Sequence, residues 1–229
     1  MLVSIQRTSS GALSACAAPR GRHYTGTMQV VLPDLETRAT FEIQTDRPMS
    51  DDEFYEFCTR SPDLQIERAA TGEIILMPPA GFETGYRNNE LGRQLGYWAR
   101  ADGRGVALDS NTEYLLPNGA AFAPDASWVS RARLAAFAKE QKRRFLPLCP
   151  EFVVELVSPT DRLSRVQAKM REWIDNGAAL GWLIDADRQR AYVYRQGADT
   201  EELQRPDVLA GEGPVEGFTL EMDALWQGL

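Results

Sequence analysis

The strongest constraint on the fold is one short run in the second half of the chain. Residues 152–157 read Phe-Val-Val-Glu-Leu-Val and are apolar on both alternating faces except at Glu155. A strand with two apolar faces is typical of a sheet that is covered by helices on both sides. A carboxylate inside such a strand costs free energy unless a partner compensates it. Two partners stay open from the strand alone: a divalent cation, or an ion pair with backbone hydrogen bonds.

A second carboxylate precedes another short strand. Residues 123–129 read Ala-Pro-Asp-Ala-Ser-Trp-Val, which predicts that Asp125 enters a strand directly after a proline. Carboxylates from two neighbouring strands can share one oxygen-preferring ion such as Mg²⁺. A turn is an equally simple explanation for Asp125 taken alone, because Pro-Asp pairs are common in turns.

The remaining periodicities alternate between helix and strand. Ser50 can cap a helix that begins with three acidic residues, and Thr71-Gly72 separates the two strands of a hairpin. The patterns predict helices over 83–101, 131–140 and 161–176, strands over 64–67, 73–77, 105–109, 112–116, 152–157, 180–185 and 190–195, and then an irregular tail. This order predicts an α/β (α+β mixed sheet) domain over residues 49–229.

The N-terminal segment differs in composition from the rest. Residues 1–33 contain no Asp or Glu and show no periodicity, so we expect residues 1–48 to be a disordered or mis-called extension, with Met28 as a possible natural start. An organellar transit peptide is the alternative, since the apolar run that a secretory signal needs is missing.

Composition narrows the function classes. The net charge of −8 argues against a protein that coats nucleic acid, yet an acidic site for Mg²⁺ fits it. The only histidine, His23, lies in the N-terminal segment, which disfavours histidine-based catalysis and imidazole zinc sites. Cys16, Cys58 and Cys149 form no CxxC pair, and no apolar run reaches the roughly 18 residues that span a bilayer. We therefore expect a soluble protein of a reducing cytoplasm, without membrane contact.

Several motifs in a fixed order resemble the Uma2 family (DUF820), a branch of the PD-(D/E)xK nuclease superfamily. They are the hairpin 66–79, the stretch 111–129, the stretch 149–161, and Lys169 followed by Asn176-Gly177. Each motif alone is weak, but their order over about residues 49 to 226 is specific. The resemblance implies a restriction endonuclease-like core, a central mixed β-sheet flanked by helices.

The resemblance also implies roles for individual residues. Asp125 and Glu155 correspond to the metal-binding carboxylates, with Glu67 of the hairpin and Ser158 as possible additional site residues. Ser158 can instead cap the following helix. The lysine expected two positions after Glu155 is replaced by Val157, which is then expected to be buried. The family takes this cation from the next helix, here Lys169, although a lysine at the edge of a packed face is the simpler alternative.

These observations predict a Mg²⁺- or Mn²⁺-dependent endonuclease that hydrolyses phosphodiester bonds of DNA. We expect a homodimer, since cutting two strands requires two sites and C₂ dimers are the commonest oligomers. One alternative is a catalytically inactive nuclease-fold binding module, because a fold does not guarantee an activity. A second is a hydrolase of another class, such as a glycosidase, that uses the paired carboxylates as acid and base.

Overall fold

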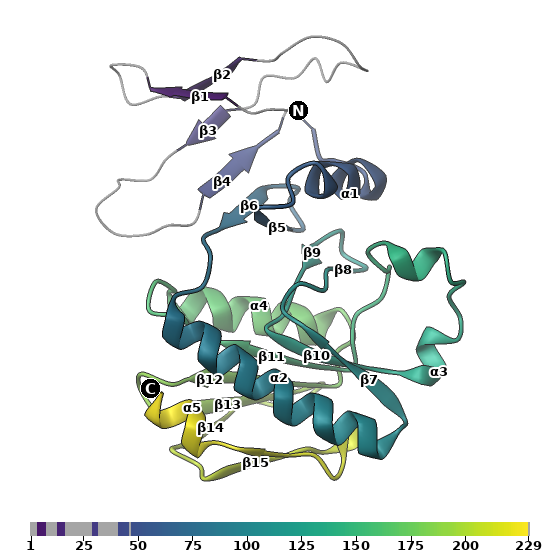
Figure 1. Ribbon diagram of the computed structural model, residues 1–229, viewed down its shortest axis with the longest axis vertical. Helices are drawn as coiled ribbons and strands as arrows, with labels where there is room; N and C mark the ends of the chain where they lie inside the picture. Colours follow the sequence, from purple (N-terminus) through teal and green to yellow (C-terminus); the bar gives the residue numbers. More distant parts are fainter. Residues whose placement is uncertain (1–3, 8–12, 17–28, 32–40, 46, 229) are drawn as a thin grey trace. The chain divides into compact units, whose positions relative to one another are not determined.

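The computed structural model describes residues 4–7, 13–16, 29–31, 41–45 and 47–228 (Figure 1). The chain divides into two compact units. The first comprises residues 1–79 and 118–122, and the second comprises residues 80–117 and 123–229. Both Asp125 and Glu155 belong to the second unit.

The second unit is built on a six-stranded sheet with the strand order β14-β13-β12-β11-β10-β7. Its strands are β7 (Gly105–Asp109), β10 (Ala126–Ser130), β11 (Phe152–Leu156), β12 (Leu180–Asp185), β13 (Arg190–Arg195) and β14 (Glu201–Gln204). β11 and β12 are parallel and all other neighbours are antiparallel, so the sheet is mixed. All residues of β11 are buried, as the apolar pattern predicted.

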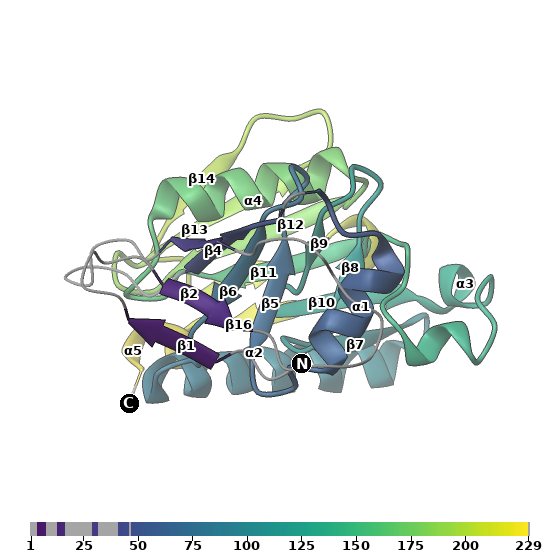
Figure 2. The same cartoon turned by 90° about the horizontal axis from the view of Figure 1, so that it is seen from above.

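Two long helices, α2 (Phe82–Asp102) and α4 (Leu163–Asp175), cover opposite faces of this sheet (Figure 2). On the α2 face, Leu91 and Leu95 belong to the same buried cluster as Val154 of β11. On the α4 face, Met170 packs so closely on Gly181 that an added Cβ would overlap its methyl group. The expected α/β architecture, a mixed sheet flanked by helices, is confirmed.

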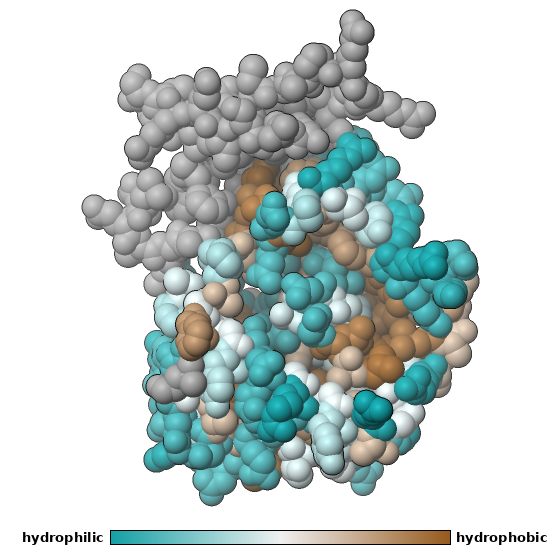
Figure 3. All heavy atoms as spheres, viewed as in Figure 1, coloured by the Kyte–Doolittle hydropathy of each residue, from teal (hydrophilic) through white to brown (hydrophobic). Residues whose placement is uncertain are grey.

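The ends of these helices follow local chemistry. Gly103 ends α2 in the left-handed region at φ 76°, and its N–H donates to Ala99 O at 3.0 Å. The outward surface of α2 is largely hydrophilic (Figure 3), as the spacing of its apolar residues predicted. α4 ends at Asn176, after which Gly177 adopts φ 114°.

The first unit contains the predicted hairpin and capped helix. Ser50 and Glu53 form a capping box at the start of α1 (Asp51–Thr59). β5 (Gln65–Arg68) and β6 (Ile74–Met77) pair antiparallel around Gly72, which has φ 93°. The other strands of this unit are β1 (Ser4–Arg7), β2 (Leu13–Cys16), β3 (Gln29–Val31), β4 (Phe41–Gln44) and β9 (Ala121–Phe122).

The N-terminal segment is only partly described. β4 pairs antiparallel with β6, an addition to the hairpin that no sequence pattern indicated. Residues 1–3, 8–12, 17–28, 32–40 and 46 lie outside the described residues, so the assignment of 1–48 as an extension and the boundary at residue 49 stay predictions. Within the described part, no helix is long and apolar enough to cross a membrane.

Two predictions for the second unit are wrong. The helix expected over 131–140 is only α3 (Arg131–Leu134), followed by a short 3₁₀ turn, η1 (Gln141–Arg143). α3 buries no residue, so no buried apolar side chain supports a longer helix.

The tail expected to be irregular forms β15 (Val208–Ala210), η2 (Gly213–Val215), β16 (Thr219–Glu221) and α5 (Asp223–Gln227). Phe218, Leu220 and Leu225 of this tail are buried in the core on the α2 face. The remaining element is the short strand β8 (Tyr114–Leu115).

Candidate metal centre

β10 and β11 lie side by side and set the positions of the two predicted carboxylates. The pairs Ala126↔Val154 and Ser127↔Val153 fix an antiparallel register, and Asp125 directly precedes β10. Asp125 lies just outside this paired register, before the start of β10. Its side chain accepts from the backbone N–H of Leu156, the residue after Glu155, so it lies beside the end of β11 that carries Glu155.

Glu155 is buried, with 5% of its surface exposed, and α4 supplies its partners. Its Oε1 atom accepts a hydrogen bond from Trp173 Nε1 at 2.9 Å and lies 2.9 Å from Lys169 Nζ. Lys169 Nζ also donates to Ala123 O at 3.3 Å. One oxygen of the buried carboxylate is therefore held by a cation and an indole N–H from the same helix.

Asp125 is held by groups from two other elements. Its Oδ2 accepts from the backbone N–H of Leu156 at 2.7 Å, and its Oδ1 accepts from Asn88 Nδ2 of α2 at 3.0 Å. Burial raises the pKa of the Asp125 carboxyl above its ordinary value. The Leu156 hydrogen bond, the charge of Lys169 and the Asn88 hydrogen bond oppose this rise in pKa without cancelling it. An additional positive charge beside Asp125 would thus offset a real cost of burying the ionised form.

Lys169 interacts with both carboxylates, directly with Glu155 and through its charge with Asp125. Its side chain is 16% exposed, so the contact is not that of a solvated surface lysine. The chain has only three lysines, Lys139, Lys142 and Lys169, among 25 basic residues. A lysine ammonium is a compact point charge, whereas a guanidinium is a broad planar fork. The expected contact of Lys169 with Glu155 is present, while its direct or water-bridged contact with Asp125 and its catalytic role stay predictions.

The donor atoms at this site suit a hard divalent ion. Mg²⁺ and Mn²⁺ prefer oxygen ligands, and Mg²⁺ keeps several waters while it binds one or two protein carboxylates. Among the described residues, no group of three or more His, Cys, Asp or Glu side chains could hold a metal. A two-carboxylate site completed by neutral oxygens fits this arrangement, whereas a zinc site of sulfur and imidazole ligands does not.

Glu67 and Ser158 are the two further residues that were predicted at the site. Glu67 is buried in β5 and belongs to the other compact unit, so its role stays a prediction. The backbone N–H of Ser158 donates to Asp161 Oδ2 at 2.9 Å in the loop before α4. Ser158 does not cap α4, because Arg162 occupies the N-cap position. Val157 is half-buried rather than buried, and its N–H donates to Ile184 O at 2.9 Å.

The structure adds two residues to the site that the motifs did not identify. Trp173 lies in the helix predicted over 161–176, and its indole N–H contacts Glu155. Its signal in the sequence is the spacing from Lys169, because residues four apart share one helix face. Asn88 lies in the helix predicted over 83–101, and its amide contacts Asp125. No sequence pattern links Asn88 with a residue 37 positions later.

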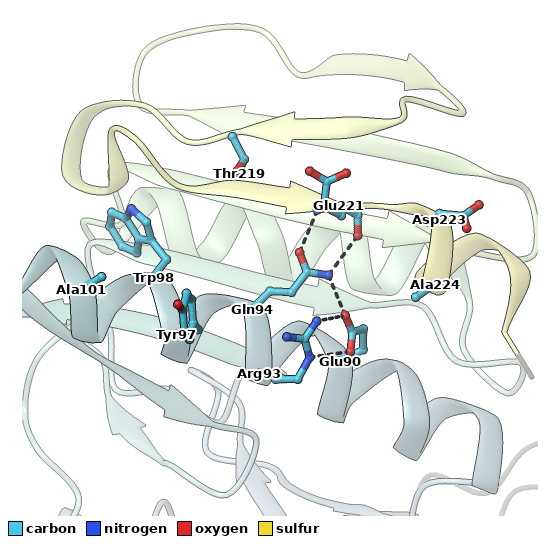
Figure 4. A pocket seen from close by; sticks show the side chains of 10 residues that line it. All are labelled: Glu90, Arg93, Gln94, Tyr97, Trp98, Ala101, Thr219, Glu221, Asp223 and Ala224. Atoms are coloured by element: carbon cyan, nitrogen blue, oxygen red, sulfur yellow. Dashed lines mark hydrogen bonds and ion pairs between the residues drawn. The ribbon is translucent and has the colours of Figure 1, made fainter.

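A groove of about 530 Å³ on the α2 face lies away from these carboxylates (Figure 4). The Gln94 amide bridges it by pairing with the backbone of Glu221, accepting at 2.8 Å and donating at 3.1 Å. Arg93 is paired with Glu90 across 2.6 Å. Glu221 and Asp223 line the groove and are exposed, so their carboxylates would repel a phosphate bound there. These negative charges of the groove disfavour contact with a nucleic-acid backbone.

Comparison with known proteins gives the family and the fold of the chain. Residues 51–223 match the model of the Uma2 family, which is described as a putative restriction endonuclease family. The chain belongs to the Uma2 family. A crystal structure from Anabaena variabilis ATCC 29413, described as a putative nuclease belonging to DUF820, is similar with a TM-score of 0.65 and 21% identity. The match covers 79% of this Uma2 chain and 98% of that protein. A search of curated proteins finds no match.

Proposed function

We propose that this Uma2 protein is a divalent-metal-dependent endonuclease that hydrolyses phosphodiester bonds of DNA. The observation that carries the proposal is the 2.9 Å contact between Lys169 Nζ and Glu155 Oε1, beside a second carboxylate on the neighbouring strand. The ammonium of Lys169 contacts Glu155 and its charge acts on Asp125, although the strand lacks the usual lysine. Membership of the Uma2 family and a nuclease-like fold support a nucleic acid as the substrate class.

Asp125 and Glu155 would hold the Mg²⁺ or Mn²⁺ ion. Such an ion supplies an activated water and stabilises the charge that develops on the phosphate. Trp173 and Lys169 fix the orientation of the Glu155 carboxylate by occupying Oε1. The ammonium of Lys169 is also suited to orient the attacking water or to stabilise the pentavalent phosphate.

Cleavage of duplex DNA would require one such site for each strand. We therefore propose a homodimer. Its two-fold axis would relate the two active sites in the way that the two-fold axis of duplex DNA relates the two DNA strands. Analytical ultracentrifugation at micromolar concentration tests this part separately. A monomer under these conditions would refute the dimer while leaving cleavage of single strands open to the activity assay.

Relaxation of supercoiled plasmid DNA in the presence of Mg²⁺ or Mn²⁺ tests the activity. The wild-type protein should nick the plasmid, and a chelator, Asp125→Asn or Glu155→Gln should abolish nicking. Lys169→Met should slow nicking by about 10² or more and leave metal affinity nearly unchanged, because its charge acts mainly in the transition state. The exposed lysine Lys142 provides the matched control, and Lys142→Met should retain wild-type activity. Full activity of Lys169→Met would refute the proposed role.

The same ion pair favours one alternative, a nuclease-fold binding module that does not cut. Lys169 already compensates the buried charge of Glu155, so the fold does not require an ion at this place. Such a module would bind no Mn²⁺ at Asp125 and Glu155. Calorimetric titration with Mn²⁺ separates the two functions, and DNA binding without metal binding or nicking would establish the alternative.

A further inference from the structure

Asn88 has one half of its amide paired and the other half buried without a partner. Its Nδ2 donates to Asp125 Oδ1 at 3.0 Å. Its Oδ1 is a buried acceptor for which the described part of the chain provides no hydrogen-bond donor. The two atoms share one carbon, so this oxygen lies next to the carboxylate of the candidate metal centre.

An acceptor in this position is costly. A buried polar atom without a partner destabilises a protein, and most buried polar side-chain atoms are therefore satisfied. If Asn88 served only to hold Asp125, a donor without an acceptor, such as an indole N–H, could do so without burying an extra oxygen. The orientation of the amide follows from its partner, because exchanging N and O would turn an acceptor toward Asp125 Oδ1.

We infer that Asn88 Oδ1 is a third protein ligand of the divalent ion held by Asp125 and Glu155. This inference rests on the proposed function and extends it by one ligand, on α2, that no motif supplied. An amide carbonyl is an oxygen donor of the kind that Mg²⁺ and Mn²⁺ accept. The ion would give the buried oxygen the partner that the described residues lack.

The charge of the site also favours a neutral ligand. Lys169 already contributes one positive charge beside the two carboxylates. A third carboxylate in place of the amide would add repulsion between like charges in the metal-free protein. An amide adds an oxygen ligand without this cost. It also donates a hydrogen bond to Asp125, which fixes both ligands relative to each other.

The binding of Mn²⁺ itself provides the test, without reference to cleavage. Mn²⁺ affinity is measured by titration calorimetry and by electron paramagnetic resonance of free Mn²⁺, for the wild type, Asn88→Ala and Asn88→Asp. The adjacent exposed Asn89 provides matched controls, Asn89→Ala and Asn89→Asp, which make the same changes one residue along α2. Thermal unfolding with a chelator verifies that each variant is folded.

As a ligand, Asn88→Ala should weaken Mn²⁺ binding about 10-fold or more. Asn88→Asp should bind Mn²⁺ at least as tightly as the wild type, because it retains an oxygen in place, and both Asn89 variants should match the wild type. If Asn88 only donates to Asp125, Asn88→Asp will weaken binding as much as Asn88→Ala, and the inference is wrong.

Failure of this inference differs from failure of the proposed function. Wild-type Mn²⁺ binding that is lost in Asp125→Asn but unchanged in Asn88→Ala overturns the third ligand alone. A wild-type protein that binds no Mn²⁺ overturns both the metal centre and the third ligand.

Discussion

Replacement of Lys169 by methionine in the metal-free protein should destabilise the fold more than any exposed lysine substitution. The methionine keeps most of the length of the side chain and removes the ammonium. It leaves the Glu155 carboxylate with 7% side-chain exposure and without its nearest cation. Removing one member of a buried ion pair typically costs about 3–5 kcal/mol, against about 0–1 kcal/mol for a surface pair.

The remaining contacts of Glu155 reduce this cost. Trp173 Nε1 still donates to Oε1, and the exposed fraction of Lys169, 16%, admits some water to the site. We therefore expect a loss of about 3 kcal/mol, the lower end of the range for buried pairs. The double variant Glu155→Gln, Lys169→Met should recover a large part of it, because a neutral amide needs no cation.

Urea unfolding in the presence of a chelator measures this effect for the wild type, both single variants and the double variant. The four free energies of unfolding give the coupling between the two side chains. Added Mn²⁺ should stabilise Lys169→Met and the wild type by similar amounts, because the two proteins should bind the ion with nearly equal affinity. A loss below about 1 kcal/mol would place the pair in the range of surface salt bridges and refute the reasoning.

Three further predictions concern stability. Burial raises the pKa of Asp125 in the folded protein, so the metal-free protein should lose stability as the pH rises from the unfolded-state pKa through the folded-state pKa. Asp125→Asn should remove this loss. Urea unfolding midpoints at about pH 4 and pH 7 measure the effect for both proteins. Gly181→Ala should cost about 1–3 kcal/mol in urea unfolding, because its Cβ would overlap the terminal methyl of Met170. Gly103→Ala should cost only about 1–2 kcal/mol by the same assay, from its φ of 76° alone, since no other atom lies within 4 Å of the added Cβ.

The elements that enclose the site could be predicted because their patterns are long and local. β11 is apolar on both faces, and α4 repeats its apolar residues at helical spacing, so both appear in the structure within a few residues of the prediction. The link between Lys169 and Glu155 required the family resemblance in addition. The residue that usually provides the cation is Val157, and spacing alone does not indicate which helix residue reaches back to the strand.

The interactions that complete the site depend on tertiary contacts. The Leu156 N–H reaches Asp125 because β10 begins beside the end of β11, and Asn88 reaches it from a helix on the other face of the sheet. No periodic pattern of residues in the sequence predicts either contact. The same limit explains the C-terminal tail, where β15 and β16 have three residues each, too few to show alternation.

The displaced lysine has a physical explanation in the geometry of the sheet. Residues two apart on a strand point to the same face, so a lysine at position 157 would lie on the face of Glu155. α4 packs on that same face, and Lys169 and Trp173, four residues apart, both reach Glu155 from it.

Electrostatic stabilisation depends on where a charge lies, and not on which element carries it. A helix anchored by the buried side chains of Met170 and Trp173 can hold the ammonium at least as firmly as a strand end, where Val157 is only half-buried. If Lys169 takes the place of the strand lysine, as we propose, the site keeps two carboxylates and one cation, and the absence of a lysine at position 157 does not by itself indicate an inactive site.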